Sequence, residues 1–336
     1  MIYGHRSVII LSGVFSEWDK CLMKKHIRDV QEGSKMEWEA RLIEWVQAHI
    51  GSLGGYVELL AFLGAETGLL LIVLIVMFCW KKSAGQKLAL IVACVNMWLP
   101  MIKSVVLRPR PFMKYPDRVK PLVLDAEGAA KDVAAQGYSF PSMHSASIPA
   151  VYFPLAKEAK KKWLWVLAAV LTLLVGISRP VAGMHYPTDV LAGWILGFAV
   201  IGIFALLDRY IRNEWLYHMI LIVSGLPGLF FVRTNDYFTA LGCLIGGIAA
   251  IHFERKYVDF QDTRRILAMI LRVVGAFLTY VVVNTLLKLP FDKEFLSGAS
   301  FGALLIRMVR YAIIMFLIMG AYPVAFPFFE RIGRKK

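Results

Sequence analysis

The sequence has little charge and few acidic residues for its length. Of its 336 residues 18% are charged, and 24 Asp and Glu stand against 38 Lys and Arg. Soluble domains are about half apolar and about a quarter charged, whereas 58% of this chain is hydrophobic and its mean hydropathy is +0.60. The shortage of charge argues against a water-soluble protein of this length, and the long apolar runs indicate a membrane protein.

Cysteine is also scarce. The four cysteines are Cys21, Cys79, Cys94 and Cys243, and no two of them form a C-x-x-C pair. A disulfide framework or a zinc site needs closely spaced or paired cysteines. We therefore expect free thiols buried in apolar surroundings, and no metal ion or other cofactor.

The net charge of +14 raises the question of nucleic acid. A nucleic-acid site would need a basic patch with interleaved aromatic residues, and this sequence has none. Many of the Lys and Arg residues lie in short segments between apolar runs. We interpret them as cytoplasmic anchors that face anionic lipid. The partner expected from this charge pattern is the bilayer, with no nucleic acid, and the sequence sets no oligomeric state.

About nine segments are near the roughly 20 residues that cross a bilayer as a helix. They are 57–80, 86–107, 143–157, 163–182, 188–208, 215–232, 236–253, 265–287 and 303–329. No alternating strand pattern appears, so helices are the spanning elements. The predicted fold is an all-α polytopic membrane protein, with a six-helix core and additional C-terminal transmembrane helices.

The chain divides into four predicted regions. Residues 57–208 are the catalytic core, and 209–336 are accessory transmembrane helices. Residues 36–56 form an amphipathic interfacial helix whose apolar face includes Trp38 and Ile43, with Glu39 elsewhere. Residues 1–35 are predicted to be a disordered segment or a mis-assigned start, because the codons for Gln31, Glu32 and Gly33 can form a ribosome-binding sequence shortly before Met36.

Polar and charged residues interrupt the apolar pattern in three segments at span ends, 103–111, 140–145 and 178–189. Ionisable residues at the membrane boundary are costly and mark functional sites. The basic connections at 81–87, 157–162, 209–212, 255–265 and 331–336 place the opposite ends of the spans in the cytoplasm. The three segments therefore share the extracytoplasmic face of a multi-pass protein of the cell membrane.

Three basic residues of these segments, Lys103, Arg110 and Arg179, suit a phosphate dianion. Arg presents a planar fork that matches phosphate oxygens, and Lys acts as a point charge. Separate spans would bring the three side chains to one membrane face. We predict that together they hold a phosphate group without a metal ion.

A helix is expected to begin at Ser142, because Pro141 precedes it. The backbone N–H groups of residues 142–144, including that of Met143, would then point at the same anion. The sequence therefore predicts that this helix start completes the phosphate site.

Two histidines are available for bond and proton chemistry. His185 and Asp189 are four residues apart at the start of the fifth span, and Pro187 suits the first turn of that helix. Asp189 can accept from one ring nitrogen of His185, which fixes the tautomer and leaves the other nitrogen to attack. His144 would then act as the general acid, and later as the base for water.

The spacing of these residues forms a recognisable pattern. It consists of Lys103, six residues and Arg110-Pro111, then Pro141-Ser142-x-His144, then Ser178-Arg179, five residues, His185, three residues and Asp189. This pattern resembles the type 2 phosphatidic acid phosphatase superfamily. That family includes lipid phosphate phosphatases, bacterial undecaprenyl pyrophosphate phosphatases, sphingosine-1-phosphate phosphatases and glucose-6-phosphatase. The resemblance covers roughly residues 57–208, and residues 63–66 are similar to the leading helix of the sphingosine-1-phosphate branch.

The resemblance implies a metal-independent phosphatase that forms a phospho-histidine. It implies His185 as the nucleophile, Asp189 as its orienting partner and His144 as the acid. It also implies Lys103, Arg110, Ser142 and Arg179 as phosphate ligands. Met143 departs from the family pattern, which usually has Gly there, and this departure concerns the shape of the pocket beside the phosphate.

The expected reaction is hydrolysis of a lipid phosphate or polyprenyl pyrophosphate, such as undecaprenyl pyrophosphate. Two alternatives remain open at this stage. A hydroxyl other than water could resolve the phospho-histidine, which would make the protein a lipid phosphotransferase. A transporter or scramblase that keeps the fold is the other alternative, with Arg272 and Arg307 as its intramembrane features.

Overall fold

The structure is a computed structural model that describes residues 37–50, 54–122, 137–298 and 300–332. The described residues form helices joined by turns and loops, with no strand among them. The predicted all-α membrane fold is therefore confirmed. The prediction about residues 1–35 lies outside the described residues.

The first half of the chain holds the helices that surround the three polar segments. These are α2 (Glu37–Ile50), α3 (Gly54–Gly64), α4 (Glu66–Ile75) with η2 (Val76–Trp80), α5 (Lys82–Val106), α6 (Pro111–Lys114), α8 (Met143–Ala159), α9 (Lys162–Val181) and α10 (Pro187–Tyr210). The second half holds α11 (Glu214–Gly225), α12 (Gly228–Phe231), α13 (Asn235–Phe253) with η3 (Glu254–Val258), α14 (Ile266–Leu286), α15 (Lys293–Ser297), α16 (Phe301–Phe316) with η4 (Leu317–Ala321) and η5 (Tyr322–Ala325), and α17 (Phe326–Arg331).

All nine predicted spans are helical, but they are not equally suited to crossing a bilayer. In the described part of the chain, seven helices are long and apolar enough to span, or eight if the bent pair 55–64 and 67–80 is one span. The predicted span 143–157 forms α8, which has 17 residues and two prolines and is not among them. The chain is therefore a multi-pass membrane protein with seven or eight such helices.

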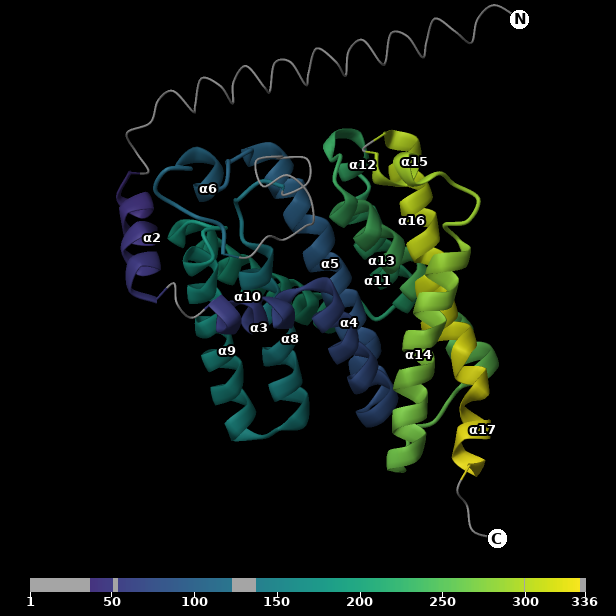
Figure 1. Cartoon of the computed structure of the whole chain (residues 1–336). Helices are drawn as coiled ribbons and strands as arrows, with labels where there is room; N and C mark the ends of the chain where they lie inside the picture. The colour runs from purple at the N-terminus through teal and green to yellow at the C-terminus, as the bar shows by residue number, and fades with distance from the viewer. Residues whose placement is uncertain (1–36, 51–53, 123–136, 299, 333–336) are drawn as a thin grey trace, which may run out of the picture.

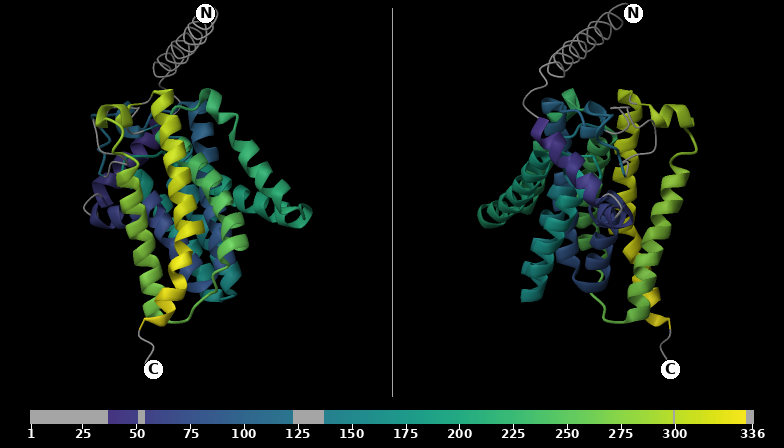
Figure 2. Two further views of the ribbon diagram at one scale, coloured as in Figure 1. Left: turned by 90° about the vertical axis from the view of Figure 1, so that its right-hand side faces the viewer. Right: turned by 60° about the vertical axis from the view of Figure 1, so that its left-hand side comes forward.

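The two halves of the chain lie beside each other in the bundle. Figure 1 shows α8, α9 and α10 on one side and α13, α14 and α16 on the other, with α4 and α5 between them. Helix α13 packs against both α5 and α16, so it joins the halves. Helices α14 and α16 run side by side along the bundle (Figure 2).

Local sequence places the polar segments at one end of the bundle. Helix α5 ends at Leu107, which takes a left-handed conformation with φ 55°, and Pro109 follows it. Helix α8 begins at Ser142, whose side chain accepts from the Ser145 N–H. Helix α10 begins with Pro187 in its first turn. The end of α5 and the starts of α8 and α10 therefore carry the three segments to the same face.

The N-terminal helix α2 differs in one respect from the prediction. Trp38, Leu42 and Trp45 are exposed, as expected of a helix that lies at the membrane interface, while Ala40 and Ile43 are buried. Glu39 is also buried, with 2% of its surface exposed, although we assigned it to the polar face. Its position one turn before Ile43 puts it on the face that packs against the protein.

Buried charges in the second half bond between helices. Arg272 of α14 donates to the Glu330 carboxylate of α17 at 3.0 Å, and Arg310 of α16 donates to Asn284 Oδ1 of α14 at 2.7 Å. Buried charges in a membrane protein are retained where they are paired in this way. These bonds give Arg272 a structural role and weaken its support for a transport path.

The close contact between α13 and α16 requires glycine at position 246, because this residue has no side chain. A Cβ at Gly246 would lie 2.0 Å from the Ala312 carbonyl oxygen, whereas the nearest atom to a Cβ at Gly247 is Met319 Sδ at 3.8 Å. We expect Gly246→Ala to lower the free energy of unfolding by about 1–3 kcal/mol, because the helices must separate. Thermal melting of the purified protein in detergent measures this effect.

Gly247→Ala is the matched control, because both substitutions change helix propensity equally. The difference between the two variants then isolates the helix contact. Equal melting temperatures for the two variants would contradict this description of the interface.

Candidate active site

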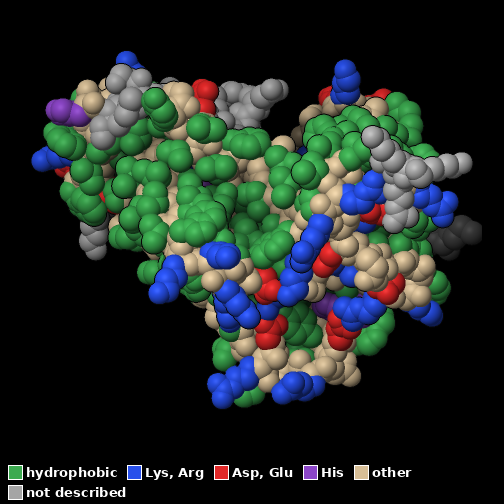
Figure 3. Space-filling view, turned by 90° about the horizontal axis from the view of Figure 1, so that it is seen from below, with side chains coloured by type: hydrophobic (Ala, Val, Ile, Leu, Met, Phe, Trp, Pro, Cys, Tyr) green, Lys and Arg blue, Asp and Glu red, His purple; other side chains and the backbone are tan. Residues whose placement is uncertain are grey.

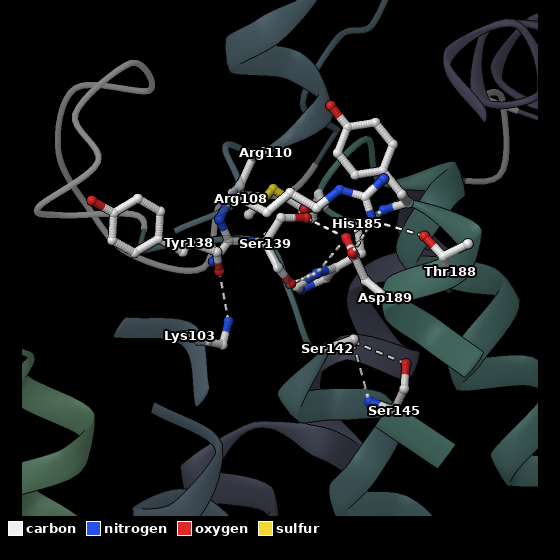
Figure 4. A network of polar contacts seen from close by, with 12 residues as sticks. Lys103, Arg108, Arg110, Tyr138, Ser139, Ser142, Ser145, His185, Thr188 and Asp189 are labelled. Atoms are coloured by element: carbon white, nitrogen blue, oxygen red, sulfur yellow. Dashed lines mark hydrogen bonds and ion pairs between the residues drawn. The ribbon is translucent and has the colours of Figure 1, made fainter. Parts of the chain in front are cut away.

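The first polar segment and the loop that leads into the second are joined by hydrogen bonds to backbone oxygens (Figure 4). Lys103 Nζ donates to the Tyr138 carbonyl at 2.7 Å, and Arg110 Nε donates to the Gly137 carbonyl at 3.1 Å. The Ser139 N–H donates to the Arg108 carbonyl at 2.8 Å. The loop before α8 therefore lies against the end of α5.

The third segment joins the other two in the same place. The Ser142 N–H donates to the Asp189 carbonyl at 3.0 Å, which ties the start of α8 to the start of α10. Gly193 permits this close approach, because a Cβ there would lie 2.6 Å from the Ser142 carbonyl oxygen. Arg110 Nη1 is 3.5 Å from the Met184 carbonyl. The three segments that the sequence singled out therefore converge.

His185 is buried, with 1% of its surface exposed, and its ring is held by the backbone. Nδ1 lies 2.8 Å from the Ser139 carbonyl oxygen and 3.7 Å from Asp189 Oδ2. A carbonyl oxygen only accepts, so Nδ1 carries the proton and Nε2 keeps its lone pair. The predicted partner Asp189 therefore faces Nδ1, and the Ser139 carbonyl is the nearer acceptor.

Burial is the main reason why the pKa of His185 is lowered from 6.5 to about 4. A buried site disfavours the charged imidazolium, and the nearby cations Arg110 and Lys103 disfavour it further, while Asp189 opposes them. The ring is therefore neutral at physiological pH. A neutral ring with a lone pair on Nε2 is in the state that a nucleophile needs.

The Asp189 carboxylate is held from both sides. Its Oδ2 accepts from the Ser139 hydroxyl and from the Tyr186 N–H at 2.8 Å. Its Oδ1 accepts from Arg108 Nη1 at 2.5 Å. Because Ser139 supplies both this hydroxyl and the carbonyl that binds His185, Asp189 orients the ring through Ser139.

Glu39 and Arg108 extend this network to the N-terminal helix α2. Arg108 Nη2 donates to Glu39 Oε2 at 2.5 Å, and the Arg108 guanidinium lies 3.9 Å from the centre of the Tyr186 ring. Glu39 Oε1 accepts from the Thr188 hydroxyl at 2.7 Å and from the Thr188 N–H at 3.2 Å. The helix α2 is therefore bonded to the start of α10 and, through Arg108, to Asp189.

The three predicted phosphate-binding cations are all buried. Lys103, Arg110 and Arg179 expose 8%, 2% and 0% of their surfaces. Arg179 donates to the Ser178 hydroxyl at 3.1 and 3.2 Å, and its Nη2 lies 3.4 Å from the Val57 carbonyl. The hydrogen bonds given above for the three cations go to carbonyl and hydroxyl oxygens, which orient the side chains. Arg108 pairs with two carboxylates, Glu39 and Asp189.

The start of α8 carries Ser142, Met143 and His144, as predicted. Its geometry corrects one detail, because the Ser142 N–H is bonded to Asp189 and is not directed at an anion. The Ser142 hydroxyl accepts from Ser145 Oγ at 2.9 Å, so its own proton can be donated to a ligand. His144 packs against α3, where a Cβ at Gly64 would lie 3.0 Å from its ring.

In the ranges that the structure covers, no three His, Cys, Asp or Glu side chains gather as a metal site. Cys79 and Cys243 are partly buried and Cys94 is buried, and all three are free thiols. That no metal or other cofactor is needed remains a prediction from the sequence.

Sequence reasoning missed Glu39, Arg108 and Ser139 as members of this network. Glu39 did carry a signal, because it lies on the same helix face as Ile43. Arg108 was read as part of the first segment but given no role. Ser139 carried no signal, because its carbonyl could come from any residue type.

Two parts of the chain match known protein families. Residues 84–212 match the PAP2 superfamily. Residues 238–334 match the transmembrane extension of PAP2 superfamily phosphatases. The first match contains all of the predicted catalytic and phosphate-binding residues, and the second contains most of α13 and all of α14 and α16.

Three curated relatives are similar to parts of the chain. An undecaprenyl-diphosphatase of Sulfolobus acidocaldarius is 40% identical over 60 residues, which are 18% of this chain and 29% of the relative. Phosphatidylglycerophosphatase B of Bacillus subtilis is 30% identical over 164 residues, which are 45% of this chain and 73% of the relative. The bacitracin transport permease protein BcrC of Bacillus licheniformis is 47% identical over 60 residues, which are 18% of this chain and 28% of the relative.

The chain thus spans less than a third of the length of two of these relatives. No solved structure matches the chain significantly. The relatives described do not bear on the sphingosine-1-phosphate branch, so that part of the resemblance stays a prediction.

The titration of His185 tests the geometry of the site directly. We expect its ring in the folded protein to stay neutral down to about pH 4 and to gain a proton below that. In the unfolded chain the ring should titrate near its ordinary value of about 6.5. Histidine-selective NMR of labelled protein measures the midpoint, and His185→Gln identifies the resonance. A folded-state midpoint at or above 6.5 would contradict a ring buried beside Lys103 and Arg110.

Proposed function

Because the chain belongs to the PAP2 superfamily, we propose that it is a membrane phosphatase for a lipid phosphate or polyprenyl diphosphate, and that it acts through a phospho-histidine on His185. The observation that carries the proposal is the state of the His185 ring. Nδ1 donates to the Ser139 carbonyl at 2.8 Å, so Nε2 has a lone pair on a buried ring near the cations Arg110 and Lys103.

In the first proposed step, Nε2 of His185 attacks the terminal phosphorus of the substrate. The bond from phosphorus to the lipid alkoxide or to the leaving phosphate breaks, and His144 gives its proton to the departing oxygen. The Nδ1 proton stays on the ring, where the Ser139 carbonyl stabilises the positive charge that develops. The products are a phosphoryl group on His185 and a protonated leaving group, which is a lipid alcohol or a lipid monophosphate.

In the second step, His144 takes a proton from a water molecule, and the water oxygen attacks the phosphorus. The N–P bond breaks, inorganic phosphate leaves, and the electron pair returns to Nε2. General acid–base catalysis of this kind contributes roughly 10²–10⁴-fold to a rate. The two steps return both histidines to their starting states.

The charge on the transferring phosphoryl group would be stabilised by Lys103, Arg110 and Arg179, with the Ser142 hydroxyl as a further donor. Their burial supports this role, because charges act more strongly in a site that excludes water. Their hydrogen bonds to carbonyl and hydroxyl oxygens support it as well, because the side chains are already in place before substrate binds.

A series of hydrogen bonds and ion pairs would keep His185 in its reactive tautomer. Glu39 binds Arg108, Arg108 binds Asp189, Asp189 binds the Ser139 hydroxyl, and the Ser139 carbonyl binds His185. We assign Glu39 and Arg108 a positioning role, because neither contacts the ring. Small errors in the placement of a reacting group cost large factors in rate.

The orientation we propose places the site at the extracytoplasmic face. Its support is the distribution of basic residues at the other end of the bundle, where Figure 3 shows Lys and Arg side chains gathered together with Asp and Glu. Cytoplasmic connections carry such an excess of cations. The substrate class is supported by the site's place at the end of a transmembrane bundle, where a headgroup can bind while its tail stays in lipid.

The proposal is tested by replacing the nucleophile. We expect His185→Gln to lower phosphate release from long-chain lipid phosphates and undecaprenyl diphosphate at least about 10³-fold, because no other residue forms the covalent intermediate. Purified protein mixed briefly with a ³²P-labelled substrate and quenched in base should retain label that acid removes, as a phospho-histidine does.

His252 provides the control, since it lies in α13 and is bonded to His218. His252→Gln should keep most of the activity and all of the trapped label. Unchanged phosphate release in His185→Gln would rule out this mechanism. Transfer of the phosphate to an added alcohol, with none released as free phosphate, would favour a phosphotransferase.

The positioning role of Glu39 makes a separate prediction. We expect Glu39→Gln to lower kcat by roughly 10- to 100-fold with a much smaller change in KM, because Arg108 and Asp189 shift without loss of a phosphate ligand. Glu37→Gln removes an exposed carboxylate of the same helix, which pairs with Arg41, and should leave kcat unchanged.

Steady-state kinetics on both variants measure the split between kcat and KM. A fall in protein yield or melting temperature, with normal kcat for the folded fraction, would show that Glu39 serves only the fold. A rise in KM alone would place Glu39 in substrate binding and contradict the positioning role.

A further inference from the structure

A cavity of about 350 Å³ lies between the two halves of the bundle, apart from the polar site. Helices α3, α4 and α5 line it from the core, and α13, α14 and α16 line it from the transmembrane extension. Most of its wall is hydrocarbon, and its lining includes Leu74, Val92, Asn96, Cys243, Phe277 and Met315. Binding pockets for small molecules and lipids have volumes of this order.

The cavity lies on the same face of α5 as the phosphate site. Ala89, Val92 and Asn96 line the cavity, and Lys103 follows Asn96 by seven residues. Spacings of three, four and seven residues return to one face of a helix. At 1.5 Å per residue, Lys103 stands about 10 Å above Asn96 along the helix axis. The cavity therefore begins below the phosphate site, toward the middle of the bundle.

Helix α3 provides a second connection between the cavity and the site. Phe62 lines the cavity, and Gly64, two residues later, packs against the ring of His144. The chain then bends by 56° between α3 and α4, so that α3 crosses the bundle while α4 descends between α5 and α14 (Figure 1). Phe62 at the cavity and Gly64 at His144 thus belong to the same short helix, α3.

We propose that this cavity binds the hydrocarbon tail of the substrate while its phosphate lies at His185. The inference rests on the proposed function and names the part of the substrate that the transmembrane extension recognises. The occupant is a long acyl or prenyl chain, because a tail must extend about 10 Å beyond the phosphate to reach Asn96. Tails much shorter than this distance gain nothing from the cavity.

The physical gain is placement of the substrate. A lipid tail in the bilayer is already in an apolar medium, so moving it into the cavity yields no large hydrophobic gain. A tail held at a fixed place below Lys103 brings the phosphate to His185 in a reactive orientation. The extension would therefore act on selectivity for chain length, and its effect on affinity would be small.

Filling the cavity tests the proposal. Val92→Phe and Thr239→Phe put added volume into the lining from α5 and α13. The control is Val281→Phe on α14. It also replaces a valine by phenylalanine, but at an exposed position outside the cavity lining. The substrates are dioleoyl phosphatidate and dihexanoyl phosphatidate in detergent solution, and the quantity compared is the ratio of kcat/KM for the long substrate to that for the short one.

We expect Val92→Phe and Thr239→Phe each to lower this ratio at least about 10-fold, and Val281→Phe to leave it within about 2-fold of the wild type. An unchanged ratio in both filled variants would overturn the tail site. Equal losses for both substrates would also overturn it, because they would indicate a structural lipid or a packing role. Absence of hydrolysis of both phosphatidates and of undecaprenyl diphosphate by the wild type would instead contradict the proposed function.

Cross-linking provides a measurement that does not depend on turnover or on the filled variants. A long-chain phosphate with a photoreactive diazirine at the far end of its tail is bound to His185→Gln protein and irradiated. We expect labelled peptides from α5 around residues 89–96 and from α14 around residues 277–280. Label confined to the outer surfaces of α9 and α10 would overturn the proposal.

Discussion

The hydrogen bond from His185 Nδ1 to the Ser139 carbonyl is the interaction on which the site depends. It decides which ring nitrogen carries the proton, and hence which one can form a bond to phosphorus. The carbonyl is fixed in turn, because the Ser139 N–H binds the Arg108 carbonyl and the Ser139 hydroxyl binds Asp189. Asp189 therefore acts on the nucleophile through a neighbouring residue. Burial lowers the pKa of the ring to about 4, so the same arrangement supplies a neutral nucleophile at physiological pH.

The charges around this bond are divided between two tasks. Arg108 is paired with Glu39 and Asp189, and its charge serves to hold the site together. Lys103, Arg110 and Arg179 are oriented by neutral oxygens, and we propose that their charge serves the substrate. The pairing of Arg108 with Glu39 also makes the N-terminal helix α2 part of the site, although this helix lies outside the family match.

Much of the fold and of the site could be predicted from sequence, because both depend on spacing. Apolar runs near 20 residues located the helices, and polar interruptions at their ends located His185, His144 and the three cations. Partners supplied by the backbone could not be predicted, since the Ser139 carbonyl has no side-chain signature. The predicted span 143–157 forms α8, which has 17 residues and contains Pro149 and Pro154, and it is shorter than the helices that qualify as candidate spans. The prediction placed Glu39 on the polar face of α2, but it lies on the face that packs against the protein. The sequence does not distinguish these two faces for a carboxylate.

The most direct test of the central claim is a structure of the protein with orthovanadate, which mimics a phosphoryl group during transfer. We predict vanadium bonded to Nε2 of His185, its oxygens contacted by Lys103, Arg110 and Arg179, and Nδ1 still donating to the Ser139 carbonyl. Vanadate bound elsewhere, or attached to a ring that has turned Nδ1 away from Ser139, would contradict the assignment of the nucleophile.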